Sequence, residues 1–172
     1  MATQDNNTWV QGHVTPWWGL DHRNLDYIQE PFNDSKSLNE WRQLGYTQTR
    51  FTGDMYDMRF PEPDWMDPFY SLFPWNNLSW SVYRMGPGCV LPAHSDTYAR
   101  FKKIYNLPHT SSVIRTIVFL EDWKSGHYLE MNGQPIISWR AGDWVSWRDD
   151  FIHLAANVGK TDRYTLQLTG SG

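Results

Sequence analysis

A histidine and an aspartate two positions apart, His94 and Asp96, are the first residues here whose types and spacing suit metal chemistry. They follow a turn at residues 86–88 and a short apolar run. In an extended chain, residues at i and i+2 point to the same side, so this imidazole and this carboxylate can face one ion. His153, on a later apolar run, can supply a third ligand. Two histidines and one carboxylate leave coordination positions open, an arrangement that suits non-haem Fe(II) with room for a substrate and O₂.

A second pattern lies ten residues after His153. Between residues 163 and 169, the polar side chains of Arg163, Thr165 and Gln167 alternate with apolar ones. An antiparallel core strand normally buries an apolar face. A polar face turned inward makes sense if it holds an anion, because Arg binds carboxylates through a two-pronged fork and Thr adds a hydroxyl donor.

Short strands must position these residues. From residue 78 onward, apolar or alternating runs recur between turn signals, of which Asn132-Gly133 is the strongest hairpin signal. Residues 97–106 have apolar side chains at helical spacing and predict a helix directly after Asp96. The spacing of the runs predicts the eight strands of a sandwich or barrel, at residues 78–85, 89–93, 112–120, 127–131, 134–139, 144–147, 152–158 and 163–169.

The first 77 residues have a different character. Residues 34–45 begin with capping residues and end at a glycine, which predicts a helix with Leu38, Trp41 and Leu44 on one face. Residues 46–51 alternate as a strand would, and a short helix is expected within residues 64–73. We therefore expect one mainly β domain over residues 1–172. Its jelly-roll core, a double-stranded β-helix of cupin-like type, spans residues 78–169, and residues 1–77 form a cap region with helices packed on one side.

Composition narrows the classes of function. The chain has 172 residues and a net charge of −4, and Lys102-Lys103 is its only pair of adjacent basic residues, so no nucleic-acid partner is expected. A single cysteine, Cys89, excludes an intrachain disulfide and a Cys-based zinc site. The polar N-terminus and the lack of a long apolar run predict a cytoplasmic protein with no membrane partner. The 11 tryptophans predict a thick aromatic core or an aromatic-lined binding surface.

His94-Ser95-Asp96, His153, and Arg163 with Thr165 together resemble the H-x-D…H…R-x-S/T signature of the Fe(II)/2-oxoglutarate-dependent oxygenases. The resemblance covers residues 78–169. His94 and Asp96 follow the second predicted strand and His153 lies on the seventh, the same strands as in this family. The surroundings of His94 and of His153 are similar to the aspartyl/asparaginyl and prolyl hydroxylase groups. Members of the first group lack the carboxylate ligand, whereas Asp96 is present here.

By this resemblance, His94, Asp96 and His153 would be the catalytic residues that ligate Fe(II). Arg163 and Thr165 would hold the distal carboxylate of the co-substrate 2-oxoglutarate, and O₂ would take the remaining coordination site. The reaction would release succinate and CO₂ while a substrate C–H bond is hydroxylated, with ascorbate as the reductant in vitro. The expected substrate is an amino acid, a residue in a peptide or another small molecule.

Five other residues are candidates near this site. Tyr83, on the first predicted strand, stands where similar enzymes direct a tyrosine hydroxyl at 2-oxoglutarate. Arg115, on the third, is a candidate for contact with the co-substrate or an acidic substrate. The helix at residues 97–106 should lie by the pocket entrance, which makes Tyr98 and Arg100 candidates for substrate contact. Trp147 flanks the predicted site strands and is a third.

Plainer structural roles remain open for several of these residues. Asp96 could cap the helix that follows it, since Asp is a preferred N-cap. Arg163 could be a surface residue paired with Asp162 or Asp143. Tyr83 could be a packed aromatic side chain, and Arg115 could face solvent. Thr165 and Gln167 could be ordinary polar groups of the barrel interior. The histidines outside the motif are expected in loops or at the surface: His13, His22, His109 and His127.

Two other functions compete with the oxygenase. An aromatic-rich jelly-roll module could bind carbohydrate by stacking exposed tryptophans on sugar rings, which requires neither His94 nor Arg163. A cupin-like metalloenzyme that does not use 2-oxoglutarate would keep the metal ligands and have no use for Arg163 and Thr165.

Overall fold

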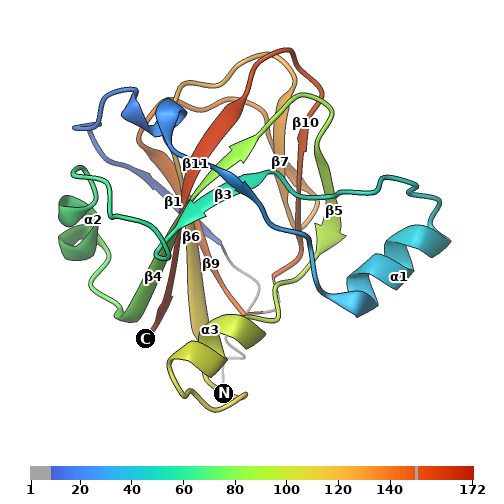
Figure 1. Cartoon of the computed structure of the whole chain (residues 1–172), viewed down its shortest axis with the longest axis horizontal. Helices are drawn as coiled ribbons and strands as arrows, with labels where there is room; N and C mark the ends of the chain where they lie inside the picture. The colour runs from blue at the N-terminus through green and yellow to red at the C-terminus, as the bar shows by residue number, and fades with distance from the viewer. Residues whose placement is uncertain (1–8, 150) are drawn as a thin grey trace, which may run out of the picture.

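Two antiparallel β-sheets face each other in the computed structural model, which describes residues 9–149 and 151–172 (Figure 1). The larger sheet has the strand order β1-β9-β6-β11-β4-β3-β2, and the smaller has the order β5-β10-β7-β8. The fold is the mainly β jelly roll, or double-stranded β-helix, that the strand spacing predicts.

The eight predicted core strands are all present, and they alternate between the sheets except at the β7–β8 hairpin. The first, third, sixth and eighth lie in the larger sheet, and the others lie in the smaller one. Asn132 and Gly133 both have positive φ (48° and 80°), as a type I′ hairpin requires. The core strands are β4 (Asn76–Met85), β5 (Val90–His94), β6 (Val113–Phe119), β7 (His127–Met131), β8 (Gln134–Ile136), β9 (Asp143–Arg148), β10 (His153–Asn157) and β11 (Arg163–Ser171).

The N-terminal region adds strands to the larger sheet as well as helices. These are β1 (Val10–His13), β2 (Ile28–Gln29) and β3 (Asp54–Asp57), with β1 paired to β9 and β3 paired to β4. The prediction of a strand at residues 46–51 is wrong. The Arg42 guanidinium donates hydrogen bonds to the carbonyls of residues 46 and 48, so these backbone acceptors are used by a side chain and not by a neighbouring strand.

The helices are short. They are η1 (Asp21–Asn24), α1 (Ser35–Gln43), α2 (Asp67–Leu72) and α3 (Ala99–Ile104). Asp34 caps α1 as predicted, because its carboxylate accepts from the backbone N–H groups of Lys36 and Ser37. Trp41 is buried, whereas Leu44 is 70% exposed and does not belong to the buried face expected for it. None of the helices in the described part of the chain is long and apolar enough to cross a membrane.

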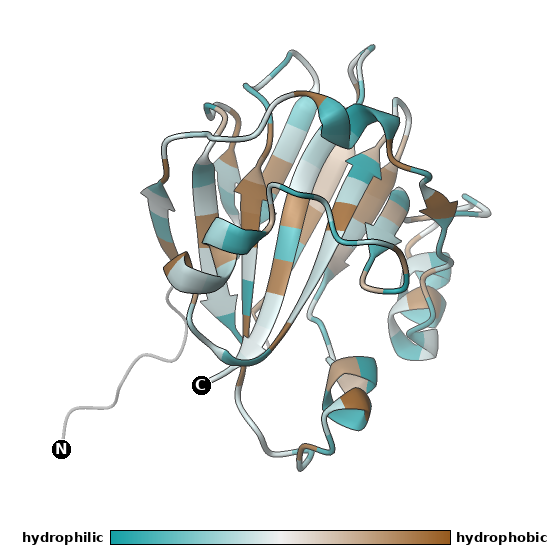
Figure 2. Cartoon of the chain, turned by 60° about the vertical axis from the view of Figure 1, so that its left-hand side comes forward, coloured by the Kyte–Doolittle hydropathy of each residue, from teal (hydrophilic) through white to brown (hydrophobic). Residues whose placement is uncertain are grey.

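Strand β11 is buried on both of its faces. Its outward side chains, which include Leu166 and Leu168, pack in a hydrophobic cluster with α2 residues such as Phe69. Its inward side chains alternate with these and face the barrel interior, so β11 carries bands of opposite hydropathy, as the strands of the larger sheet do in Figure 2. The N-terminal segments therefore supply the apolar cover of the sheet, and the inner face is free to carry Arg163 and Thr165.

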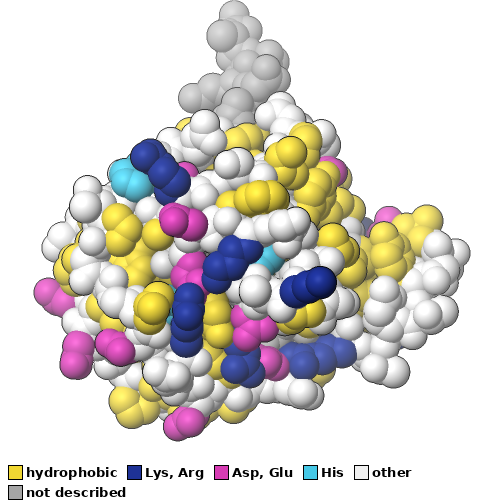
Figure 3. Space-filling model, turned by 90° about the horizontal axis from the view of Figure 1, so that it is seen from above, with side chains coloured by type: hydrophobic (Ala, Val, Ile, Leu, Met, Phe, Trp, Pro, Cys, Tyr) yellow, Lys and Arg dark blue, Asp and Glu magenta, His cyan; other side chains and the backbone are white. Residues whose placement is uncertain are grey.

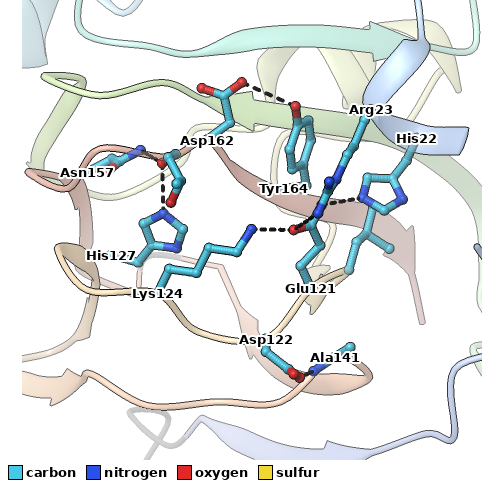
Figure 4. A network of polar contacts seen from close by, with 12 residues as sticks. His22, Arg23, Glu121, Asp122, Lys124, His127, Ala141, Asn157, Asp162 and Tyr164 are labelled. Carbon is cyan, nitrogen blue, oxygen red and sulfur yellow. Dashed lines mark hydrogen bonds and ion pairs between the residues drawn. The ribbon is translucent and has the colours of Figure 1, made fainter. Parts of the chain in front are cut away.

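One end of the barrel, at the top of Figure 1, is closed by an ion-pair network around Glu121 (Figure 4). The Glu121 carboxylate accepts hydrogen bonds from Arg23 (2.6 and 2.7 Å), Lys124 (2.6 Å) and His22 (2.9 Å). This network ties η1 to the loop after β6. Seen from above, the same end of the molecule shows basic and acidic side chains close together (Figure 3).

Asn157 fixes the loop between β10 and β11 at this closed end. Its amide donates to the carbonyls of Met85 and Thr161, and its side-chain oxygen accepts from the N–H of Gly159. His127 donates from Nε2 to the same Thr161 carbonyl (3.0 Å). His127 is 3% exposed, so the expectation that it lies at the surface is wrong, and His22, expected in a loop, lies in η1 and is 0% exposed. They are structural because buried backbone carbonyls and carboxylates need donors.

Candidate metal centre

His94 and His153 meet at the end of the barrel away from Glu121. His94 is the last residue of β5 and His153 the first of β10, and the two are direct partners in the antiparallel ladder. Their ring centroids lie 4.4 Å apart. The register of β10 shifts between His153 and Ala155, an irregularity of the kind that re-aims side chains at active sites.

Asp96 completes a three-residue cluster. One of its carboxylate oxygens lies 3.7 Å from Nε2 of His94, and the other lies 3.8 Å from Nε2 of His153. The three ligand atoms lie within 4.8 Å of one another. The two distances are too long for hydrogen bonds. They suit two ligands of one ion, because donors at about 2.1 Å from a shared ion are at most about 4.2 Å apart.

Backbone carbonyls fix the tautomer of both histidines. The Nδ1–H of His94 donates to the carbonyl of Pro92 (2.8 Å), and that of His153 donates to the carbonyl of Phe151 (3.0 Å). With the proton on Nδ1, each Nε2 presents its lone pair to the space beside Asp96. Metal-ligating histidines are typically held by this kind of contact.

The electrostatic environment keeps His153 neutral and Asp96 ionised at neutral pH. Burial lowers the pKa of His153 to about 4, although the Asp96 carboxylate opposes the shift. Burial alone would raise the pKa of Asp96, but Arg115, His94 and His153 together hold it well below its usual range. Neutral imidazoles and an ionised carboxylate are the forms that bind metal ions.

Asp96 does not cap the helix that follows it. The N-cap of α3 is Tyr98, and no side chain hydrogen-bonds to the first turn. The carboxylate of Asp96 is therefore not used as a helix cap, and it faces the two histidines.

Aromatic side chains support the ligands from behind. Phe32 and Trp41 pack edge-on against the His94 ring, with centroids 5.4 and 5.8 Å away. The Trp41 indole N–H also donates to the carbonyl of Ala93 (3.0 Å), which anchors α1 to the end of β5. Trp147 packs against His153 at 4.8 Å. The sequence gives no signal for Phe32 or Trp41, because their contacts join segments far apart in the chain.

Arg163 lies inside the barrel, 4% exposed, and not on the surface beside Asp162 or Asp143. One of its terminal nitrogens donates to the carbonyl of Tyr128 (2.8 Å), and its buried Nε has no partner. None of the ion pairs formed between described residues includes it. Burial lowers its pKa to about 10, so the guanidinium is still charged at neutral pH.

Thr165 and Tyr83 surround the same region of the interior. They are direct partners across β11 and β4, two residues along β11 from Arg163 towards the candidate metal ligands. The buried Thr165 hydroxyl has no partner. The Tyr83 hydroxyl accepts from the N–H of Gly53, which leaves its own proton free to be donated. Burial raises the Tyr83 pKa to about 12, so the hydroxyl remains a donor.

A pocket of about 460 Å³ opens beside Asp96. Arg115 and Tyr98 line its inner part, and Arg100 lies nearer the mouth, where it pairs with Glu30 at 3.2 Å. Arg115 is not solvent-facing: its side chain is 19% exposed and reaches towards Asp96 (3.7 Å). Arg163 and Thr165 are not among the lining residues and lie deeper in the barrel.

Comparisons with known proteins support the fold. No family model and no curated protein matches the sequence. Among solved structures, a prolyl-4-hydroxylase from Pseudomonas putida matches with a TM-score of 0.58 and 11% identity, over 98% of this chain and 94% of that one. The cupin domain of Cnp3 from Schizosaccharomyces pombe matches with a TM-score of 0.43 and 11% identity, over 69% of this chain and 64% of its own. A cupin protein from Bacteroides fragilis has a TM-score of 0.41 and 10% identity, over 74% and 84% of the two chains. At 11% identity the likeness to the prolyl-4-hydroxylase shows the fold alone.

The donor set defines what this centre can bind. Two neutral imidazoles and one carboxylate on one side of an ion suit a divalent transition metal and leave other coordination positions open. Asp96 lines the pocket, so the pocket reaches one side of the cluster, while His94 and His153 are not among its lining residues. The arrangement is that of a possible metal site in a cupin-like barrel.

Proposed function

We propose that this protein is an Fe(II)- and 2-oxoglutarate-dependent dioxygenase that hydroxylates a C–H bond of an amino acid, a residue in a peptide or another small molecule. The observation that supports this most strongly is the buried guanidinium of Arg163. An unpaired buried cation costs several kcal/mol, so a fold that keeps one needs an anion to compensate it.

The groups around Arg163 fit one end of a dicarboxylate. The guanidinium of Arg163, the hydroxyl of Thr165 and the hydroxyl of Tyr83 are three donors with no carboxylate partner. A carboxylate is acceptor-only and can satisfy all three. The 2-oxo acid end of the same molecule would then point towards the cluster of His94, Asp96 and His153.

The residues of the centre have different roles in the proposed reaction. The bound metal would supply the open positions for the 2-oxo acid and for O₂. His94, Asp96 and His153 would hold it, with the Pro92 and Phe151 carbonyls keeping both imidazoles in the required tautomer. The aromatic side chains behind the ligands exclude water from that side.

The competing functions account for less of the structure. A cupin-like metalloenzyme without 2-oxoglutarate leaves the charge on Arg163 uncompensated. A carbohydrate-binding module needs exposed tryptophans, yet Trp17 is the only one of the 11 that is exposed, and it packs on Trp18 and Phe69. The proposed partner is therefore a small molecule or peptide, with no role for nucleic acid or membrane.

The test measures metal, co-substrate and turnover separately. Protein supplied with Fe(II), 2-oxoglutarate and ascorbate should release succinate, and the Mn(II)-loaded protein should bind 2-oxoglutarate in a calorimeter. Arg163→Gln should weaken that binding about 10- to 100-fold, the loss expected for a hydrogen bond to a charged group. Arg148→Gln is the matched control, because Arg148 is an exposed arginine on β9. Unchanged 2-oxoglutarate affinity in Arg163→Gln would contradict the proposal.

A further inference from the structure

Arg115 stands at the inner end of the pocket beside Asp96. One terminal nitrogen donates to the side-chain oxygen of Gln167 (2.6 Å), and the other lies 3.7 Å from Asp96, beyond hydrogen-bond distance. Its buried Nε has no partner. A guanidinium carries five N–H donors, so most of those on Arg115 are unused.

Two further donors lie beside this guanidinium. Tyr98 places its ring 5.3 Å from the Arg115 guanidinium, and Trp147 is the direct partner of Arg115 across β6 and β9. The Tyr98 hydroxyl and the Trp147 indole N–H are both buried without a hydrogen-bond partner. Tyr98 also has φ = 52°, a left-handed conformation that is costly for a non-glycine residue. The strained backbone of Tyr98 and the unpaired donors beside it indicate a binding site for a group rich in hydrogen-bond acceptors.

The charges that face this pocket leave Arg115 without a carboxylate of its own. At the mouth, Arg59 pairs with Asp57 and Glu30, and Arg100 pairs with Glu30. Asp96 is the remaining acid near Arg115, and under the proposed function its charge is used by the metal. The positive charges are those of the divalent ion, Arg115 and Arg163. Asp96 and the dianion 2-oxoglutarate compensate all but one of them, and a monoanion would neutralise the last.

Beside these ion pairs, part of the outer wall of the pocket is apolar. Phe32, Met55 and Phe101 contribute to its walls. Met58 and Ile104, at 50% and 64% exposure, lie among the lining residues and present apolar surface to solvent. Exposed apolar side chains grouped at a pocket mouth indicate a surface that a ligand covers.

We propose that this pocket binds a small organic acid, with its single carboxylate on Arg115 and its apolar body against Met55, Met58 and Ile104. Tyr98 and Trp147 contribute the neighbouring donors. The inference rests on the proposed function, because it assigns the class of substrate that this centre would hydroxylate. It separates two arginines by role, with Arg163 for the co-substrate and Arg115 for the substrate.

The experiment compares hexanoate with its amide, hexanamide. Both are titrated into Mn(II)-loaded protein with and without saturating 2-oxoglutarate, with tryptophan fluorescence and calorimetry as readouts. Hexanoate should bind at least about 10-fold more tightly than hexanamide, the smallest factor expected for a charge-assisted hydrogen bond. Affinity should rise about fourfold per methylene from butanoate to hexanoate, the factor that corresponds to ~0.8 kcal/mol.

Variants then assign the carboxylate to one arginine. Arg115→Gln should weaken hexanoate about 10- to 100-fold, and Arg115→Lys, which keeps the charge, should retain most of the binding. Arg148→Gln should leave hexanoate binding unchanged. The comparison of hexanoate with hexanamide needs no variant, so it stands even if Arg115→Gln does not fold.

Two results would overturn the inference. One is equal affinity for hexanoate and hexanamide in the wild-type protein. The other is a loss of 2-oxoglutarate affinity in Arg115→Gln but not in Arg163→Gln, which would make Arg115 the co-substrate residue. Failure of the proposed function looks different: the protein would not bind 2-oxoglutarate at all, while the dependence of hexanoate binding on Arg115 would still be measurable.

Discussion

The two ends of the barrel each place a partly buried carboxylate among basic side chains, but with different geometry. At the closed end, Glu121 accepts close hydrogen bonds from Arg23, Lys124 and His22 (2.6 to 2.9 Å). At the metal end, Asp96 lies 3.7 to 3.8 Å from its two histidines and from Arg115. Close contacts satisfy a carboxylate, whereas the wider spacing leaves room for an ion.

Buried polar atoms without partners occur in both regions but differ in kind: at the closed end they are the Nδ1 atoms of His22 and His127. Asn157, at the closed end, uses both its amide and its oxygen in hydrogen bonds. In the interior and at the metal end, Arg163, Thr165, Arg115 and Tyr98 keep buried polar atoms without partners. Unsatisfied buried donors cost stability, and those of the interior and the metal end include two guanidinium groups and two hydroxyls that an acceptor could satisfy.

The largest effect is expected from the metal ligands. His94→Ala and His153→Ala should each abolish tight binding of Mn(II) or Fe(II) and reduce succinate release to background, because each removes one of three ligands. Calorimetric metal titration and a succinate assay measure this. The control is His109→Ala, which removes an exposed histidine from a loop. Metal binding that survives in both site variants would show that the cluster is not the metal centre.

A large loss of stability is expected at the closed end. Asn157→Ala removes a fully buried side chain with three hydrogen bonds and leaves the carbonyls of Met85 and Thr161 without this donor. The free energy of unfolding should fall by about 3 kcal/mol, measured by urea denaturation. The metal affinity of the folded protein should be unchanged. A loss below about 1 kcal/mol would mean that the loop is held by other contacts.

The Glu121 network should give stability a pH dependence. Burial favours the neutral acid, but hydrogen bonds from Arg23, Lys124 and His22 outweigh it and lower the Glu121 pKa to about 2, from 4.5. A lowered folded-state pKa stabilises the protein above the unfolded-state pKa. The contribution is therefore lost as pH falls from about 4.5 towards 2.

Glu121→Gln should remove this contribution. Because Arg23 and Lys124 are partly exposed, we expect a loss of about 1–2 kcal/mol at pH 7. The variant should also show a shallower fall in stability between pH 4.5 and 2 than the wild-type protein. Parallel stability curves for the two proteins across that range would contradict the role given to Glu121.

The smallest effect is expected from a change on β11 that should lower the affinity for 2-oxoglutarate without lowering the free energy of unfolding. Thr165→Val removes a buried hydroxyl that has no partner, so the free energy of unfolding should stay within about 0.5 kcal/mol of wild type or rise. Affinity for 2-oxoglutarate should fall about 3- to 10-fold, the value of one neutral hydrogen bond.

Thr116→Val is the matched control for this change. Thr116 is also buried with an unpartnered hydroxyl, but it lies on β6 next in sequence to the inward-facing Arg115 and Ile117, so its side chain is on the opposite face of the sheet. Equal losses of 2-oxoglutarate affinity in the two variants would remove Thr165 from the co-substrate site.

Local sequence patterns are enough to predict the core strands and the ligand motif. The eight core strands follow from alternation of apolar residues and from turn signals such as Asn132-Gly133. The candidate ligand set follows from residue type and spacing, because an extended chain points His94 and Asp96 to one side, even though β5 itself ends at His94. The same two-residue period puts Arg163 and Thr165 on one face of their strand and Tyr164 and Leu166 on the other.

Which polar groups are satisfied depends on the tertiary structure. His127 and His22 show no local sign that they are buried, and Trp41 shows none that it supports His94, because their partners are distant in the chain. The turn at Tyr98 excludes the cap role for Asp96, and strand pairing places Arg115 and Arg163 in the interior. Local patterns determine the direction of a side chain, whereas burial and hydrogen-bond partners depend on the packing of distant segments.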